Sequence, residues 1–501
     1  MSEPPEAGEP RGRLEEALRA RHDALESLRA HGVEPFALGY EPSAHATDLH
    51  DRYADLAPAS TTEDRVAVAG RVVLLRRHGK LSFVTLRDAT GDIQLMLSEE
   101  AMGRNYGLVR DLDLGDIVGA DGVVATTKRG ELSVKASELT LLTKALRPMP
   151  EKWHGLKDPE LQQRQRHLQL LSDLDARRIV TARAQALRAV RELLDSRGFV
   201  EVETPVLQPV AGGAMARPFV THHHVLDTDL FLRISLELYL KRLLVGGLER
   251  IYEIGRNFRN EGIDRSHNPE FTMLEVYQAY GDYFSMMELT QAMVRAAALA
   301  VTGSERVTFR GTELDLGLDW DRVTVLGSVS EQVGEEVTLD RTDLPIIAER
   351  NGVHVDPKWG PGKVAIELYE KLVEPTLVKP TFVMDFPREV SPLARPHRMK
   401  PNLTEHVDPV VGGIELGTAY SELTDPIEQR AKFELQRQAK LAGNEEAHPF
   451  DEDFVEALEY GMPPAGGLGL GIDRLLMILT DAASLRDLIL FPHHRPETPR
   501  S

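Results

Sequence analysis

Short runs of alternating hydrophobic and polar residues follow a single helical segment in the first third of the chain. Between Leu14 and Leu28 the leucines recur with helical spacing, which predicts a helix that ends near Gly32. Five strand-like segments then follow, at residues 66–73, 81–88, 92–97, 117–124 and 132–139. Five strands with a helix between the third and the fourth are typical of an OB barrel, whose strand face often binds nucleic acid. The pattern fits equally a barrel that serves only as a packing module.

Longer helical patterns alternate with strands in the rest of the chain. After a stretch rich in Lys, Pro and Gln (residues 144–166), apolar residues from Val180 to Leu194 predict a helix that stops at Gly198. An alternating strand closed by Pro205 comes next, and we expect this pair to be scaffold. Residues 303–345 indicate strands and turns, and residues 346–378 indicate mostly helices.

These patterns predict an α+β protein with several domains, as expected for 501 residues at roughly 100–200 residues per domain. The expected parts are an N-terminal extension and helix, the barrel, a hinge, a large α+β domain and an insertion within that domain. Their expected bounds are 1–60, 61–146, 147–172, 173–501 and, for the insertion, near 303–378.

Composition narrows the class of protein. The chain has 42% hydrophobic and 28% charged residues, as in ordinary globular proteins, and its net charge of −20 argues against a general polyanion binder. The absence of cysteine excludes disulfides, a thiolate nucleophile and any cysteine-bound metal. No apolar run approaches the roughly 18 residues of a membrane helix, and the N-terminus lacks a secretory apolar segment. We therefore expect a cytoplasmic protein without a membrane partner.

Two predicted strands, near residues 250–259 and 267–277, carry the first set of candidate functional residues. Alternation places four residues on one face of the second strand, namely Phe271, Met273, Glu275 and Tyr277. A carboxylate buried among such neighbours must be paired or neutralised, so this face suits a cationic ligand, with an aromatic ring available for stacking. Arg256 and Arg259 could fork onto phosphate or carboxylate oxygens. The alternative is a hairpin stabilised by internal salt bridges.

A glycine-rich segment near the C-terminus carries the second set of candidate functional residues. It predicts a strand with glycine at every second position, at Gly467, Gly469 and Gly471. Such a strand lets a flat ligand approach the backbone; Asp473 can cap the following helix, and Arg474 can cover a base or meet a phosphate. A dinucleotide fingerprint is excluded because Ile472 stands at its third glycine, and no Walker loop is present. Close packing alone would also explain the glycines.

Residues 408–422 and the His222–His224 run are possible metal sites. Asp408 and Glu415 could hold a hard cation such as magnesium, which keeps waters and bridges phosphates, but unpaired surface acids are commoner and are favoured on these residues alone. Adjacent histidines on a strand point to alternate faces, and no helical histidine pair accompanies them, which argues against metal at the histidines.

In this order the segments resemble the class II aminoacyl-tRNA synthetases, and within them the lysyl-tRNA synthetase family, over nearly the whole chain. Three segments resemble the motifs of the class: the helix and strand ending at Pro205, residues 259–271 and residues 469–474. The segments specific to the lysyl family are residues 212–219, 237–242, 267–275 and 420–423.

The resemblance implies an OB-fold anticodon-binding domain followed by an antiparallel-sheet catalytic domain. It implies a homodimeric ligase that activates L-lysine with ATP and Mg²⁺ and transfers it to the 3′ end of tRNA(Lys). Two alternatives stay open: a lysyltransferase acting on a non-tRNA acceptor, and a non-catalytic tRNA-binding or regulatory relative. The barrel argues against the first alternative, and the presence of Arg259, Glu261 and Arg474 argues against the second.

The resemblance also implies individual roles. Catalysis would rest on Arg259, Glu261 and Arg474. ATP would be bound by Arg259, Glu261, His267, Phe271, Glu415 and Arg474, and magnesium by Asp408 and Glu415. Lysine would be bound by Gly213, Glu237, Arg259, Glu275, Tyr277, Thr418, Tyr420 and Glu422. The anticodon would be bound by Arg71, Phe83, Gln94 and Glu131. Thr418 and Asp408 depart from the Asn and Glu that the family usually has, which puts fine positioning in doubt.

Overall fold

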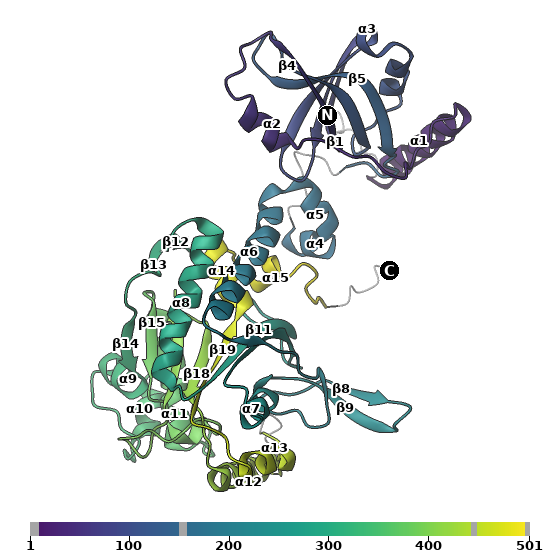
Figure 1. Cartoon of the computed structure of the whole chain (residues 1–501). Helices are drawn as coiled ribbons and strands as arrows, with labels where there is room; N and C mark the ends of the chain where they lie inside the picture. Colours follow the sequence, from purple (N-terminus) through teal and green to yellow (C-terminus); the bar gives the residue numbers. More distant parts are fainter. Residues whose placement is uncertain (1–9, 150–157, 442–447, 496–501) are drawn as a thin grey trace, which may run out of the picture. The chain divides into compact units, whose positions relative to one another are not determined.

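The computed structural model describes residues 10–149, 158–441 and 448–495, and the chain divides into two compact units, Met1–Gly155 and Leu156–Ser501 (Figure 1). Residues 1–9 of the expected extension and 150–157 of the expected hinge lie outside the described residues. Among the described residues, no helix is both long enough and apolar enough to cross a membrane.

The first unit is a closed five-stranded barrel with strand order β1-β2-β3-β5-β4. Its strands are β1 (Thr61–His78), β2 (Leu81–Arg87), β3 (Asp92–Ser98), β4 (Ile117–Thr126) and β5 (Leu132–Thr143). Only β3 and β5 pair in parallel. The helices are α1 (Pro10–Ala30), α2 (Ala46–Arg52), α3 (Glu99–Met102) and the 3₁₀ turn η1 (Gly103–Arg110). The predicted OB layout, with α3 and η1 between the third and fourth strands, is confirmed.

Along β2, buried residues alternate with partly exposed ones. Val84 and Leu86 are fully buried and join the barrel core, whereas the intervening Phe83 and Thr85 remain partly exposed on the outer face. Strand residues therefore divide into a packed interior and a face open to a ligand, as the period of two requires.

The second unit is built on a nine-stranded sheet of order β14-β15-β16-β18-β19-β11-β10-β6, with β17 paired to β16. Its strands are β6 (Val200–Glu201), β10 (Arg250–Phe258), β11 (Glu270–Ala279), β14 (Asp321–Thr324), β15 (Thr381–Met384), β16 (His406–Val411), β17 (Ile414–Glu415), β18 (Gly417–Ser421) and β19 (Ala465–Gly471). The sheet is antiparallel except at the β6–β10 and β14–β15 pairs. This antiparallel-rich sheet confirms the α+β class.

Helices cover one face of this sheet and leave the other face for the site. The covering helices α6 (Leu174–Ser196), α8 (Tyr283–Thr302) and α14 (Ile472–Thr480) share one core with alternate residues of β11 and β19 (Figure 1). Leu274 and Val276 of β11 point into that core. The residues between them therefore face the opposite side of the sheet, as the sequence predicts.

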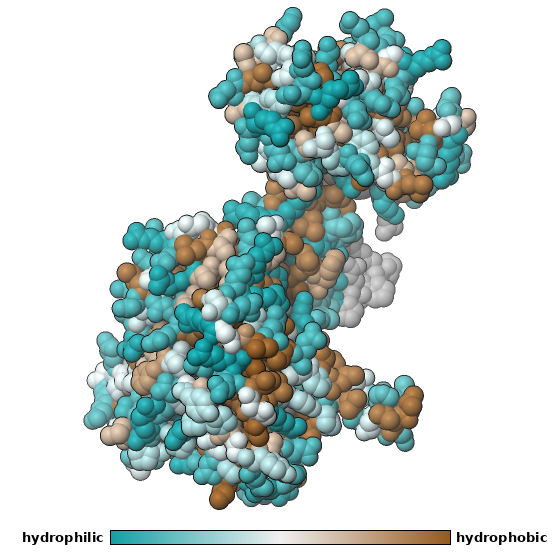
Figure 2. Space-filling model, in the orientation of Figure 1, coloured by the Kyte–Doolittle hydropathy of each residue, from teal (hydrophilic) through white to brown (hydrophobic). Residues whose placement is uncertain are grey.

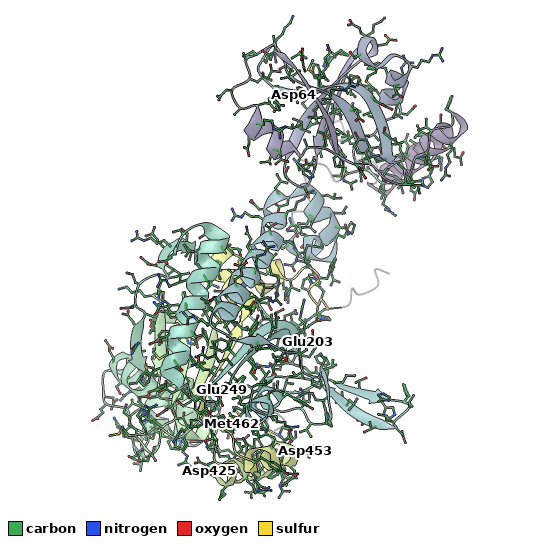
Figure 3. The ribbon with its side chains drawn as sticks, viewed as in Figure 1. Asp64, Glu203, Glu249, Asp425, Asp453 and Met462 are labelled. Carbon is green, nitrogen blue, oxygen red and sulfur yellow. The ribbon has the colours of Figure 1, made fainter. Side chains whose placement is uncertain are left out.

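The other elements frame the sheet. The helices are α4 (Pro159–Arg164), α5 (Arg166–Ser172), α7 (Glu237–Val245), α9 (Val325–Val333), α10 (Leu344–Arg350), α11 (Pro361–Leu372), α12 (Pro426–Leu441), α13 (Glu452–Glu459) and α15 (Leu485–Leu488), with 3₁₀ turns η2 (Glu374–Thr376) and η3 (Arg388–Val390). Two small sheets consist of β12 (Arg306–Phe309) with β13 (Thr312–Asp315), and of β7 (Leu207–Gln208), β9 (Thr228–Leu232) and β8 (Val220–His223). Asp425 and Asp453, labelled in Figure 3, mark the α12–α13 pair.

Two predicted elements differ from the structure. Residues 325–333, expected among strands and turns, form helix α9, because Thr324 caps its first turn and Val325 and Val329 bury one face. The predicted strand before Pro205 is only the two-residue β6, which pairs with Ile251 and Tyr252 of β10 before the chain turns away.

Exposed apolar residues gather on the β8–β9 hairpin. Val220, Val225 and Leu226 are 61%, 89% and 67% exposed, and Figure 2 shows this projecting arm as a brown patch. His222, within the same hairpin, pairs with Asp229, its Nδ1 lying 2.8 Å from Oδ1. The histidine run therefore has an acidic partner within the hairpin.

Candidate active site

A cavity of about 360 Å³ opens on the free face of the large sheet. It is lined by the hairpin loop of β10–β11, by β17 and β18, and by the junction of β19 with α14. All six residues that the resemblance assigns to ATP line this cavity, namely Arg259, Glu261, His267, Phe271, Glu415 and Arg474. Three segments distant in sequence thus meet at one place.

Arg259 lies in this cavity with an unsatisfied donor. Its guanidinium carbon is 5.1 Å from the ring centroid of Phe271, and its Nε is buried without a hydrogen-bond partner among the described residues. Burial lowers the pKa of Arg259, and the Glu261 carboxylate opposes that change. An arginine remains charged under such conditions, so this guanidinium is placed to receive an anion.

Arg474 and Glu415 form the opposite wall. Arg474 Nη1 donates to the backbone carbonyl of Glu415 at 2.8 Å and lies 3.2 Å from its carboxylate. Arg256, which the sequence offered as a second anion-binding arginine, does not line the cavity and pairs with Glu270 at 3.2 Å.

Asp473 does not cap α14, contrary to the prediction. The N-cap position is Gly471, and Asp473 lies inside the first turn. Its carboxylate instead accepts hydrogen bonds from Nη1 of Arg183 on α6 at 2.6 Å and from the backbone N–H of Thr272 on β11 at 2.8 Å. These bonds fix the start of the helix that carries Arg474.

Glu415 lines the cavity, and its acidic neighbours Asp408 and Glu374 are not among the lining residues. Burial raises the pKa of Glu415, with Asp408 contributing, and burial together with Glu415 and Asp408 raises the pKa of Glu374 to about 7. A bound cation would compensate the excess negative charge of these three carboxyl groups. No group of three or more histidine or acidic side chains in metal-binding arrangement occurs within the described residues, so a cation held here would take its other ligands from substrate and water.

Beside the cavity, and joined to it through Gly469 of β19, lies a buried cluster of the residues assigned to lysine, called the acidic pocket below. Glu275 accepts hydrogen bonds from Ser235 Oγ and the backbone N–H of Leu236, both at 3.0 Å, and from the Tyr277 hydroxyl at 3.2 Å. Burial and the charge of Glu237 raise the pKa of Glu275 to about 7. Burial also raises the pKa of Glu422 to about 8.

The alternate glycines of β19 make this pocket possible. Gly467 pairs with Tyr277 on one side and with Tyr420 on the other, and Gly469 pairs in the same way with Glu275 and Thr418. A Cβ on Gly467 would lie 2.6 Å from the Tyr277 ring and would collide with the Glu422 carboxylate. The glycines therefore allow side chains from two strands to meet across β19.

Gly213 is held beside the pocket by a histidine that sequence reasoning missed. Its backbone N–H donates to Nε2 of His448 at 2.6 Å, and its φ of +89° suits glycine. Burial lowers the pKa of His448 to about 4, so the ring is neutral and can accept this bond. Nothing in the local sequence pattern around His448 signals the contact.

Lys241 is a second missed residue. Its Nζ lies 2.5 Å from Oε1 of Glu237 and 2.5 Å from Oε2 of Glu422, and its side chain is fully buried. The four-residue spacing between Glu237 and Lys241 was the available signal, because residues four apart share a face if the segment is a helix.

The barrel has its own candidate site, a cavity of about 960 Å³ on the outer strand face. Phe83, Gln94 and Glu131 line it, as the assignment of these residues to the anticodon requires. It also contains cationic residues that the sequence analysis did not single out: Arg76, Lys128, Arg129 and Lys135. Arg71 is not among the lining residues, and its Nη1 donates to the Gly115 carbonyl at 2.7 Å.

Comparison with known proteins agrees with the fold and the site. Residues 158–495 match the family of class II tRNA synthetases (D, K and N), and residues 66–142 match the OB-fold nucleic acid binding domain. Fold and site thus define a class II tRNA synthetase. The lysine–tRNA ligases of Moorella thermoacetica and Carboxydothermus hydrogenoformans are 48% and 47% identical over 96% of this chain and over 98% and 99% of their own lengths. That of Synechococcus sp. is 47% identical over 97% of this chain and 100% of its own length. The chain belongs to this lysine–tRNA ligase family.

Proposed function

We propose that the protein activates L-lysine with ATP and transfers the lysyl group to the 3′ end of tRNA(Lys). One observation carries this function: a cavity with an unsatisfied arginine donor adjoins a buried pocket of carboxylates. The cavity suits the phosphates and the substrate carboxylate, and the pocket suits an ammonium group.

Adenylate formation needs positioning and charge stabilisation from the protein. The lysine carboxylate attacks the α-phosphorus in line, and pyrophosphate leaves. Arg259 and Arg474 stabilise the negative charge that develops on the phosphoryl oxygens. The adenine ring stacks on Phe271, and Glu261 accepts from its amino group. The terminal ribose hydroxyl of tRNA then attacks the lysyl-adenylate, so no covalent enzyme intermediate is required.

Recognition of the lysine side chain rests on Glu275, Tyr277 and Glu422. Each is at most 3% exposed, and both carboxyl groups have raised pKa values when no ligand is bound. A substrate without the second ammonium leaves these acids buried and unpaired, and such a loss discriminates strongly. Gly213 and Glu237 would bind the α-amino group, and Tyr420 would line the aliphatic stem.

Magnesium would lie beside Glu415 at the cavity wall. Asp408 and Glu415 would hold it there together with phosphate oxygens and water, and the bound ion would supply charge compensation for the phosphates. The raised pKa values of Glu415 and Glu374 support this assignment.

The barrel, residues 61–146, would read the anticodon, with bases stacking on Phe83 beside the lining cations. We also propose that the enzyme is a cytoplasmic homodimer whose catalytic domain spans residues 173–501, with an insertion near 303–378.

Lysine-dependent exchange of pyrophosphate into ATP, measured with each of the twenty amino acids, tests the activation step. We expect exchange with lysine. Exchange with aspartate or asparagine but not with lysine would contradict the proposed substrate.

A further inference from the structure

The chain places one of its own ammonium groups inside the acidic pocket. Lys241 is fully buried on α7 and bridges Glu237, on the same helix, to Glu422, which follows β18. The proposed mechanism gives this lysine no task, although its two partners are assigned to the α-amino and ε-ammonium groups of the substrate.

The charges of the pocket can be counted. Glu237, Glu275 and Glu422 interact with one another, since Glu237 contributes to the raised pKa values of both other carboxyl groups. When all three carboxyl groups are ionised, as a bound cation would favour, they and the single ammonium of Lys241 leave a net charge of minus two. Free lysine brings two ammonium groups, and its carboxylate belongs with Arg259 in the adjoining cavity. The pocket charge therefore equals the substrate charge that it has to balance.

We propose that Lys241 is a positioning and specificity-determining residue that sets the pocket at minus two and holds Glu237 and Glu422 at a fixed separation. This inference rests on the proposed function, because it assumes that lysine is the ligand. Lys241 acts on the substrate only through the two carboxylates. Without it, a third buried carboxylate would lack a counter-charge and would hold a proton until the substrate displaced it.

The surroundings of Lys241 keep its own charge near neutral pH. Burial alone would lower the pKa of Lys241, but attraction to Glu237 and Glu422 outweighs burial, so the pKa is raised and the group stays an ammonium. Burial lowers the pKa of His448 to about 4, with the charge of Lys241 contributing, so this ring is neutral. The charge of Lys241 also contributes to a lowered pKa of Lys432. The ammonium of Lys432 lies 3.6 Å from the carboxylate of Glu428. Tyr277 stays protonated because burial raises its pKa.

Steady-state exchange kinetics of Lys241→Met between pH 6 and 9 test the role. Loss of an opposite charge at this distance raises a carboxyl pKa by about one to three units, so we expect the lysine KM at pH 7 to rise about tenfold or more. The pH of the lowest lysine KM should move upward, while the ATP KM stays unchanged. Lys241→Arg keeps the charge and should return the pH profile toward that of the wild type.

A matched control is Lys144→Met, which removes another fully buried ammonium, paired with Asp113 and Asp116 in the barrel unit. It should lower thermal stability without changing the lysine KM or its pH profile. A folded Lys241→Met variant with an unchanged profile would overturn the proposal. So would a lower lysine KM, which would mean that Lys241 competes with the substrate.

The wild-type protein provides a second measurement in case Lys241→Met does not fold. Calorimetry of lysine binding at pH 6, in buffers of different ionisation enthalpy, counts the protons released. With Glu275 and Glu422 protonated and Glu237 neutralised by Lys241, about two protons should leave per lysine bound. Release of a third would contradict the proposal. Absence of lysine binding and exchange in the wild type would instead refute the proposed function.

Discussion

Thr418 and Asp408, the two departures from the family pattern, meet at one atom. Thr418 Oγ1 and Asp408 Oδ1 lie 2.7 and 2.8 Å from Nε2 of His406. Ser391 Oγ lies 2.8 Å from the other ring nitrogen. Asp408, Thr418 and Ser391 thus hold the His406 ring through both of its nitrogen atoms. Thr418 also lines the cavity, and its side chain hydrogen-bonds the hydroxyl of Tyr420.

Thr418→Val should therefore weaken binding of the substrate carboxylate. A hydrogen bond of this kind contributes about 0.5–1.5 kcal/mol, so we expect the lysine KM in exchange to rise by roughly two- to tenfold with little change in the ATP KM. Thr312→Val, on the two-stranded β12–β13 sheet, serves as the control and should change neither. An unaltered lysine KM in the folded Thr418 variant would show that its hydroxyl does not reach the substrate.

Arg259→Ala should abolish adenylate formation, because the developing phosphoryl charge loses its buried guanidinium partner. Arg256→Ala is a matched control from β10, the strand that ends just before Arg259, since Arg256 pairs with Glu270 and does not line the cavity. We expect pyrophosphate exchange to vanish in the first variant and to persist in the second. Similar exchange rates in the two variants would remove Arg259 from the mechanism.

The contribution of Glu275 and Glu422 to stability without ligand should fall as pH rises from about 4.5 to about 8. The folded pKa values of Glu275 and Glu422, about 7 and about 8, exceed the ordinary value of 4.5. The folded state thus keeps protons that the unfolded chain releases, and these two groups favour folding less as pH increases. Bound lysine supplies the missing positive charge, so its stabilising effect should grow with pH. Thermal unfolding at pH 6 and pH 8, with and without lysine, measures this difference. An increment from lysine that is equal at both pH values would contradict the raised pKa values.

Phe83→Ala should impair the use of tRNA and spare activation. Stacking of a base on such a ring is worth about 1–3 kcal/mol, so the tRNA concentration needed for charging should rise about tenfold or more. Phe36→Ala removes another partly exposed ring of the barrel unit, one that does not line the outer cavity. Normal charging by the Phe83 variant, or an equal loss of exchange, would mean that the ring is structural.

Elements with a strong local period were predictable from the sequence. The strands of the barrel, and the shared face of Glu275 and Tyr277 on β11, follow from alternation alone. The glycines of β19 were recognised as permitting close approach, yet the approaching groups proved to be Tyr277 and Glu422 of the protein itself.

Contacts between distant segments could not be predicted. Aspartate is a common helix cap, but the carboxylate of Asp473 accepts a hydrogen bond from Arg183, which lies 290 residues earlier in the chain. His448 and Gly213 are 235 residues apart, and no local pattern links them. Such partners depend on how the sheet and its helices pack, which neither spacing nor propensity specifies.

Transfer of radiolabelled lysine to purified tRNA(Lys) in the presence of ATP and Mg²⁺ tests the central claim most directly, because it requires the cavity, the acidic pocket and the barrel together. We predict ATP-dependent charging of tRNA(Lys) with lysine, with little charging of tRNA(Asp) or tRNA(Asn). Lysine-dependent exchange without any lysyl-tRNA, or transfer of lysine only to a protein acceptor, would contradict the account.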